Sequence, residues 1–254
     1  MSLLFSNVGH LDRYQVIYVD PPWRYQNFGQ KKHGAVRSHY PTMTVDQLAA
    51  VPVGDVADPA GCALVCWITA PKIVEGLGLM QRWGFRVVGK AVYWRKVYDR
   101  CVCQHGRERH QLLHDSRGDP LTHICGVRSC RCTRFQAKPY CGLGFYTRSG
   151  GEDCWLGIKG EGLTPDDHSV YEEVEAPVTV HSAKPPEVYE RIEALWPKAR
   201  KLELFARGEP RQGWSSWGND AEGSLSDLEL FGTVLPKCEQ LPACVENLQL
   251  EVFA

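Results

Sequence analysis

The sequence DPPW at 20–23 follows an apolar segment and combines groups that could act on the exocyclic amine of a nucleobase. Such an amine is a poor nucleophile because its lone pair is delocalised into the ring. The carboxylate of Asp20 can accept one amine hydrogen, and the carbonyl of Pro21 can accept the other. Pro21 and Pro22 are stiff and would hold these acceptors in place, while Trp23 offers a face for a planar base. The alternative is a strand that ends in a proline-rich turn with a tryptophan anchor.

Strands and helices that alternate along the chain must position this motif. Apolar segments predict strands at 14–20, 62–69, 85–94, 152–158 and 199–207. Helical spacing predicts helices at 44–51, with Thr44 as the N-cap, at 72–83, ending near Gly84, and at 184–196. The polar segment 24–46 and the acidic segment 161–177 are interpreted as loops. The alternation predicts an α/β domain with a mostly parallel sheet.

Three of these strands end in residues with functional side chains. In parallel sheets, ligands bind at the carboxyl ends of the strands. Asp20, the segment after Trp67 and the segment after Glu203 should therefore meet at one edge. An acid near the end of a strand often binds a ribose diol, although Glu203 could also be an outward charge on an ordinary strand.

Further motifs accompany DPPW in a fixed order: WIT, YWRK, a G-x-G-x-x-x-R stretch, HSAKP, LELFAR and W-x-x-W-G-N. In this order the chain resembles the DPPW family of adenine-N6 methyltransferases, over roughly residues 14–96 and 142–220. That family includes the catalytic subunit of the eukaryotic messenger-RNA enzyme and bacterial and phage DNA enzymes. The resemblance implies a Rossmann-like fold with helices on both faces of the sheet, and S-adenosylmethionine as the cofactor.

The resemblance also implies roles for single residues. Asp20, Pro21, Pro22 and Trp23 would form the catalytic motif, with Asp20 also near the methionine end of the cofactor. The implied cofactor-binding residues are Asp20, Lys184, Glu203, Phe205, Arg207 and Asn219. The implied substrate-binding residues are Trp23, Tyr40, Glu152 and Lys184.

The glycine-rich cofactor loop of many methyltransferases is not evident in the sequence. This fits a permuted order, in which the catalytic motif precedes the cofactor-binding strand, and it weakens a dehydrogenase interpretation. We therefore expect an adenine-N6 methyltransferase that acts on nucleic acid, with DNA favoured. The alternatives are an RNA adenine-N6, cytosine-N4 or small-molecule methyltransferase, and a non-catalytic nucleic-acid-binding subunit with the same fold.

Residues 97–141 differ in character from the rest of the chain and are interpreted as an insertion without a core of its own. They contain six cysteines and four histidines, so the insertion could fold around a structural zinc ion. The candidate ligands are Cys101, Cys103, Cys125, Cys130, Cys132 and Cys141. The Cys-x-Cys spacing is not the usual Cys-x-x-Cys, and the alternative is a loop with free thiols.

The insertion and the segment that follows it are basic. Residues 100–148 contain nine Lys or Arg against three acids, in a chain of net charge -1. This concentration indicates a face that binds phosphates beside the target base.

The predicted organisation is a methyltransferase domain over 1–220, interrupted by the insertion at 97–141, and an acidic C-terminal extension of weak structure over 221–254. Composition is ordinary for a globular protein, with 43% hydrophobic and 23% charged residues. No membrane span or signal peptide is evident. We expect a cytoplasmic protein, in the host cell if phage-encoded, which could form a homo- or heterodimer.

Overall fold

The computed structural model of the protein describes residues 13–25, 41–106, 109–114, 120–125, 127, 130, 136–142, 146–179 and 183–235. The chain forms two compact units. Unit 1 comprises Met1–Gly89, Trp155–Thr164 and Lys198–Ala254, and unit 2 comprises Lys90–Cys154 and Pro165–Pro197.

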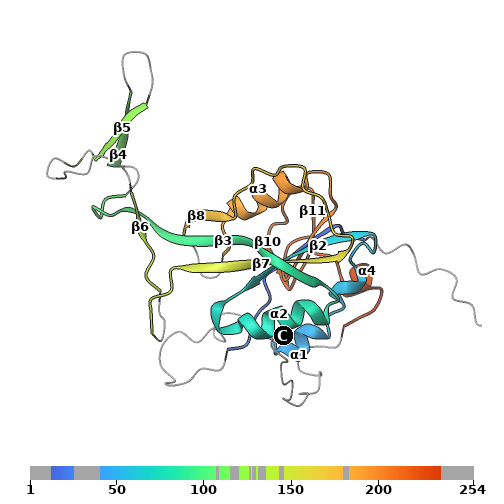
Figure 1. The fold of residues 1–254 in the computed structure, drawn as a ribbon. Helices are drawn as coiled ribbons and strands as arrows, with labels where there is room; N and C mark the ends of the chain where they lie inside the picture. Colours follow the sequence, from blue (N-terminus) through green and yellow to red (C-terminus); the bar gives the residue numbers. More distant parts are fainter. Residues whose placement is uncertain are drawn as a thin grey trace, which may run out of the picture. The chain divides into compact units, whose positions relative to one another are not determined.

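Unit 1 contains an open sheet and most of the helices (Figure 1). Its strands are β1 (Val16–Val19), β2 (Gly61–Ile68), β9 (Lys201–Leu204), β10 (Arg207–Gly208), β11 (Trp214–Trp217) and β12 (Asp220–Ala221). Its helices are α1 (Val45–Ala49), η2 (Val53–Asp55), η3 (Ala70–Lys72), α2 (Ile73–Arg82) and α4 (Asp227–Phe231). Two long strands, β3 (Arg86–Cys101) and β7 (Gly151–Gly160), run from one unit into the other.

The sheet of unit 1 has the strand order β11-β9-β1-β2, with β7 beyond β2. The pairs β1–β2, β1–β9 and β9–β11 are all parallel. All eight residues of β2 are buried, as expected for an apolar parallel strand covered on both faces. The predicted Rossmann-like α/β fold and its mostly parallel sheet are confirmed, and β1 lies between an early strand and a late one, in agreement with the permuted motif order.

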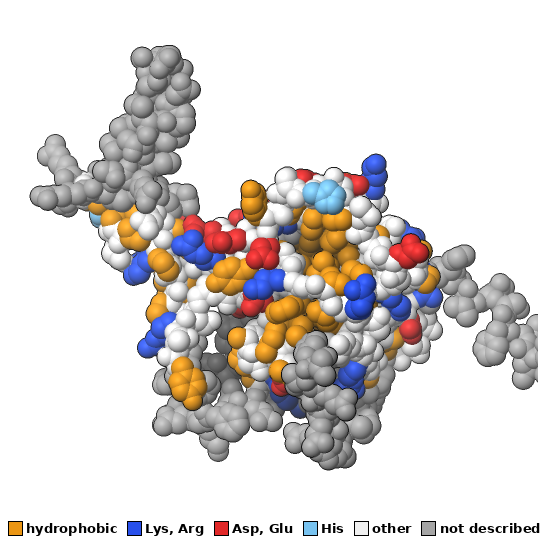
Figure 2. Space-filling model, in the orientation of Figure 1, with side chains coloured by type: hydrophobic (Ala, Val, Ile, Leu, Met, Phe, Trp, Pro, Cys, Tyr) orange, Lys and Arg blue, Asp and Glu red, His pale blue; other side chains and the backbone are white. Residues whose placement is uncertain are grey.

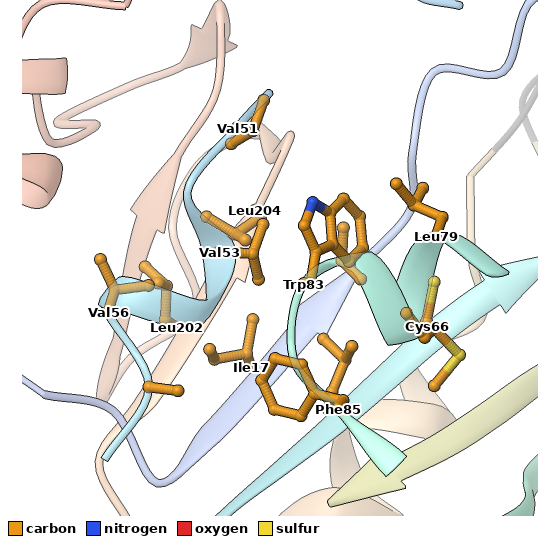
Figure 3. Packing of buried hydrophobic residues seen from close by; sticks show 14 of the residues in the cluster. Ile17, Val51, Val53, Val56, Cys66, Leu79, Trp83, Phe85, Leu202 and Leu204 are labelled. Carbon is orange, nitrogen blue, oxygen red and sulfur yellow. The ribbon is translucent and has the colours of Figure 1, made fainter. Parts of the chain in front are cut away.

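One face of this sheet forms the main core with α1, η2 and α2 (Figure 3). Ile17, Cys66 and Leu204 point from the sheet toward Leu79 and Trp83, and all of these residues are almost fully buried. The alternation along each strand sends the intervening side chains to the opposite face. The period-2 pattern of the strands therefore decides which side chains pack in the main core and which lie on the opposite face of the sheet.

Local signals begin and end the helices of unit 1 where the sequence predicts. Thr44 forms a capping box with Gln47, in which each side chain bonds the backbone N–H of the other. Helix α2 ends at Arg82, and Gly84 follows in the left-handed region with φ +85°. Only glycine adopts that conformation without strain, so the chain turns there into β3.

Unit 2 contains β4 (His110–His114), β5 (Pro120–Cys125), β6 (Ala137–Pro139), β8 (Glu173–Pro177) and α3 (Pro186–Leu195). The expectation of a loop over 161–177 is wrong at its end, because β8 pairs in parallel with β3 and buries Val174 and Ala176. Acidic and basic side chains lie side by side around β3 and β8 (Figure 2), where Arg95 forms an ion pair of 2.8 Å with Glu175. The exposed Glu173 and Glu175 alternate with the buried Val174 and Ala176, which is typical of a strand with one covered face, and the surface ion pair adds little to its stability.

Residues 97–141 are also more regular than expected. Strand β3 continues to Cys101 and pairs antiparallel with β6, while β4 and β5 form an antiparallel hairpin. Val97, Cys101 and Ala137 are buried. The segment is therefore an extension of β3 with a hairpin attached, and it is not without buried residues of its own.

The expectation of weak structure after residue 220 is wrong over α4. Ser226 caps this helix, and Leu230 and Phe231 lie in the core of unit 1. No helix among the described residues is long and apolar enough to cross a membrane.

Candidate active site

The carboxyl ends of β1, β2 and β9 lie at the same level of the sheet in unit 1. Val19 pairs with Cys66 on one side and with Leu204 on the other. Asp20 and Phe205 are therefore the next residues on two adjacent strands. Because the chain runs from β1 to β2 on one side and returns to β9 on the other, this edge is the switch point at which open α/β sheets bind ligands.

The proline-rich loop after β1 is held by backbone hydrogen bonds. The N–H of Trp23 donates to the carbonyl of Pro21 at 2.8 Å, and the N–H of Met43 donates to the carbonyl of Pro22 at 2.8 Å. The hydroxyls of Tyr25 and Thr69, which follows β2, lie 2.7 Å apart. These contacts order the carbonyl of Pro21 beside Asp20, and that carbonyl retains a second lone pair for another donor.

The structure corrects the expected role of Trp23 as an open stacking face. Only 4% of Trp23 is exposed, and the residue belongs to the hydrophobic core. Its indole Nε1 donates to the carbonyl of Trp67 at 3.3 Å. Trp23 therefore anchors the loop to the end of β2, which is the role of the alternative interpretation.

A second aromatic contact lies on the sheet face opposite the main core. Trp67 donates its Nε1–H to the hydroxyl of Tyr18 at 2.7 Å, and both residues are 1% exposed. Glu203 is half-buried and pairs in register with Tyr18, so its side chain leaves the sheet on the same face.

Burial, and then the carboxylate of Asp20, raise the pKa of the Cys66 thiol, which keeps that thiol neutral at the edge of the sheet.

The end of β9 has an unusual backbone. Phe205 has φ +58°, a left-handed conformation that a bulky residue adopts only when its surroundings impose it. Its ring meets the ring of Trp217 edge-on at 5.2 Å, and Trp217 in turn meets Phe231 of α4 at 5.3 Å. The Nε1–H of Trp217 also donates to Asp227 at 2.9 Å. Helix α4 therefore supports the strained end of β9 through one tryptophan.

Arg207 and Asn219, the remaining expected cofactor ligands, are exposed and lie after β9 and β11. Exposure leaves both side chains accessible to a ligand at this edge. Tyr40, the expected border of the base, lies outside the described residues.

Glu152 and Lys184, two of the expected substrate-binding residues, lie close together in unit 2. The Nζ of Lys184 lies 3.2 Å from a carboxylate oxygen of Glu152, and Lys96 forms a second ion pair with the same carboxylate. Burial alone would raise the pKa of Glu152, but the two ammonium groups outweigh it and lower that pKa. Glu152 is therefore an anion fixed between two cations.

Lys96 was not singled out from the sequence, although it belongs to the YWRK motif. Its Nζ lies 4.6 Å from the centroid of the Trp94 ring and 5.9 Å from that of Tyr140. Lys138 lies 5.8 Å over the ring of Tyr98, and the rings of Tyr98 and Tyr140 are 5.2 Å apart. We call Lys96, Tyr98, Lys138 and Tyr140 the lysine–tyrosine stripe. The signal for Lys96 in the sequence is its place in the YWRK motif, between the aromatic residues Trp94 and Tyr98.

Three candidate metal ligands gather after β3. The donor atoms of Cys103, His105 and Cys130 all lie within 4.8 Å of one another. Cys141, another candidate, is exposed and is not in this group. The side chains of Cys125 and Cys132 lie outside the described residues, as do several arginines of the expected phosphate-binding face. His105 completes a set that the prediction confined to cysteines.

Comparison with known proteins identifies a family and several relatives. A family model described as MT-A70 matches residues 14–116 and 123–220. The match includes every described residue of the edge formed by β1, β2 and β9, and it also runs through much of residues 97–141.

Individual relatives are of two kinds. The type II methyltransferase M.MunI of Mycoplasma sp is 27% identical over 240 residues, which cover 87% of this chain and 84% of that protein. An N(6)-adenosine-methyltransferase MT-A70-like protein of Drosophila melanogaster is 25% identical over 232 residues, covering 91% of this chain and 31% of that protein. The human N(6)-adenosine-methyltransferase catalytic subunit METTL3 is 24% identical over 223 residues, covering 87% and 30%. The chain thus spans about a third of the length of the two N(6)-adenosine-methyltransferases.

Proposed function

Because the chain belongs to the MT-A70 family, we propose that it transfers the methyl group of S-adenosylmethionine to the N6 amine of adenine in a nucleic acid. The observation that carries this proposal is the edge at which Asp20 and Phe205 extend from adjacent parallel strands. After β1, the carboxylate of Asp20 and the ordered carbonyl of Pro21 lie at this edge. At the end of β9, it is reached by the carboxylate of Glu203 and the ring of Phe205.

The residues around β9 fit S-adenosylmethionine. A half-buried carboxylate at Glu203 suits the two hydroxyls of a ribose, and the exposed side chains of Arg207 and Asn219 can add polar contacts. Phe205 offers an aromatic ring whose position is fixed by Trp217. The cofactor supplies a methyl group that is already activated by the positive charge on sulfur.

The amine would be activated by hydrogen bonding alone. Asp20 accepts a hydrogen bond from one amine hydrogen, and the second lone pair of the Pro21 carbonyl accepts one from the other. As the amine gains the methyl group it would lose one of these protons to Asp20 or to solvent, so that the product is neutral. The carbonyl of Pro21 is ordered before the substrate arrives, since backbone hydrogen bonds from Trp23 and Met43 hold the loop. Acceptors that need no rearrangement stabilise developing charge best. Because Trp23 is buried, it acts in this proposal as a positioning residue.

Unit 2 supplies groups that suit a nucleic acid. In the lysine–tyrosine stripe, the ammonium group of Lys138 can attract a phosphate and the rings of Tyr98 and Tyr140 can stack on bases, whereas the ammonium group of Lys96 is paired with Glu152. We place DNA ahead of RNA as the substrate because the type II methyltransferase M.MunI is 27% identical over 240 residues, against 24–25% over 223–232 residues for the two N(6)-adenosine-methyltransferases. In a duplex, the adenine would have to leave the base stack.

Incubation with labelled S-adenosylmethionine and unmethylated DNA or RNA, followed by nucleoside analysis, tests the proposal. We expect N6-methyladenine in DNA. N4-methylcytosine would contradict the assignment of the base, and methylated RNA without methylated DNA would contradict that of the nucleic acid.

Two variants test the role of the edge. Asp20→Asn keeps the shape of the side chain but loses its charge, and it should lower kcat by at least about 100-fold. The control is Asp46→Asn, which alters a carboxylate of α1 that pairs with Arg82 at the surface and should leave kcat unchanged. An Asp20→Asn enzyme with wild-type kcat would overturn the mechanism.

A further inference from the structure

A cluster of sulfur and nitrogen donors lies where β3 ends, outside the edge proposed for methyl transfer. The cluster consists of Cys103, His105 and Cys130, whose donor atoms all lie within 4.8 Å of one another, and of Cys101, whose thiol contacts that of Cys103. The Sγ of Cys103 lies 3.5 Å from the Nδ1 of His105, and the same sulfur also has hydrogen-bond contacts with the other two thiols. The geometry points to a binding site for one structural zinc ion, and we propose that the Cys/His cluster forms it.

The chemistry and the spacing of the donors fit zinc. Three cysteines and one histidine form a ligand set that zinc takes in closed structural sites. With Zn–S of about 2.3 Å and Zn–N of about 2.05 Å in a tetrahedron, a sulfur and a nitrogen ligand lie about 3.6 Å apart. The 3.5 Å between Cys103 and His105 matches this separation. A disulfide would join only two of the four groups and would leave the imidazole without a role.

Two backbone turns bring the donors together. At the first turn, the N–H of Gln104 donates to the carbonyl of Cys101 at 2.8 Å, and the N–H of Cys101 donates to the carbonyl of His105 at 2.8 Å. Gln104 has φ +70°, a left-handed conformation that tightens this turn. At the second turn, the N–H of Cys130 donates to the carbonyl of Val127 at 2.8 Å. These hydrogen bonds fix the backbone at Cys101, Gln104, His105 and Cys130.

A backbone donor supports one of the sulfurs from outside the cluster. The N–H of Gln136 lies 3.3 Å from the Sγ of Cys101, a buried residue. Hydrogen bonds of this kind orient thiolates and stabilise their negative charge in metal sites. The strand pairing of Cys101 with Ala137 holds this donor in place.

The position of the cluster explains what the ion would do. His105 precedes the β4–β5 hairpin and Cys130 follows it, so an ion bound to both closes the base of residues 106–129. The same ion would anchor the end of β3, three residues after Tyr98 of the lysine–tyrosine stripe. Because the ion would join two separate parts of the chain, its binding would add to the free energy of folding.

Metal analysis of the full chain tests the proposal without any measurement of activity. Protein purified without chelators and passed through gel filtration should contain about one zinc ion per chain, as expected for a single closed site. Protein that contains no zinc and takes up none from added zinc salt would overturn the proposal.

Matched cysteine variants identify the ligands. Cys103→Ser and Cys130→Ser should lose the zinc, whereas Cys141→Ser, which alters an exposed cysteine of the same unit, should retain it. Equal zinc in Cys103→Ser and the unaltered chain would overturn the assignment of the cluster.

Cobalt substitution keeps the test decisive if those variants do not fold. Co²⁺ added to the apo form of the unaltered chain should give thiolate-to-cobalt charge-transfer bands and the intense visible bands of a tetrahedral ion, all displaced by zinc. Chelation should also expose residues 106–129 to proteases while leaving S-adenosylmethionine binding intact. A spectrum of octahedral cobalt without thiolate bands would contradict the site, whether or not the proposed methyl transfer is observed.

Discussion

Two glycines of helix α2 should respond in opposite ways to the same substitution. Gly76 and Gly78 both lie inside the helix, where replacing glycine by alanine stabilises by about 1 kcal/mol through backbone propensity. A Cβ on Gly78 would meet no atom within 4 Å. A Cβ on Gly76 would lie 2.5, 2.8 and 2.9 Å from three side-chain carbons of Ile68. The surroundings therefore differ while the helical contribution is the same.

The clash at Gly76 decides the sign of the effect. Ile68 is 1% exposed at the end of β2, so its side chain has little room to move. Overpacking of this kind costs about 1–3 kcal/mol. Gly78→Ala should raise the free energy of unfolding by about 0.5–1 kcal/mol, whereas Gly76→Ala should lower it by up to about 2 kcal/mol. The difference between the two variants isolates the packing cost, because the helix propensity cancels.

Urea titrations of both variants would measure these changes. A double-mutant cycle with Ile68→Ala adds a control, since Gly76→Ala should cost less once the three carbons are gone. Equal shifts for Gly76→Ala and Gly78→Ala would refute the packing argument. So would a cost at Gly76 that persists unchanged in the Ile68→Ala background.

Three other perturbations have clear expected results. Tyr18→Phe leaves the buried indole N–H of Trp67 without its acceptor and should lower the free energy of unfolding in urea by about 1–3 kcal/mol; an unchanged value would mean that the indole finds another acceptor. The lowered pKa of Glu152 means that its ion pairs stabilise fully above the ordinary pKa of 4.5 and lose that effect as the pH falls through the lowered value. The difference in melting temperature between the unaltered chain and Glu152→Gln should therefore shrink below pH 4.5, and a constant difference would contradict this. Asp227→Ala removes the acceptor of Trp217 and should weaken the binding of S-adenosylmethionine, measured by calorimetry, more than it lowers kcat at saturation.

Much of the fold could be predicted because unit 1 obeys local rules. The segments around Ile17 and Leu64 are short and apolar on both faces, which is typical of parallel strands, whereas β9 alternates Leu202 and Leu204 with Lys201 and Glu203. The capping residue Thr44 and the terminating Gly84 lie where the sequence indicates. Strand β8 also carries a local signal, because Glu173 and Glu175 alternate with the buried Val174 and Ala176. Its pairing with the distant strand β3 could not be predicted from either segment alone.

Some features of the candidate site could likewise be predicted from the sequence, and others could not. The position of Asp20 and Glu203 at one edge of a sheet follows from strand order, and strand order could be inferred from alternating elements. The orientation of Trp23 could not, because a tryptophan after two prolines can face a ligand or the core with equal local preference. The structure settles this through two distant partners, the carbonyl of Trp67 and the hydrophobic core.

A catalytic role for Asp20 therefore depends on an aromatic framework that the motif itself does not contain. Trp23 holds the loop against Trp67, and Trp67 is held in turn by Tyr18. Shortening Trp23 to leucine should consequently lower kcat, because the acceptors of the amine would no longer be ordered before the substrate binds. The binding of S-adenosylmethionine should change little, since Glu203 lies on another strand. If Trp23 were instead a stacking face for the base, Trp23→Leu would raise KM for the nucleic acid and leave kcat at saturation unchanged, so the two roles are separated by one pair of measurements.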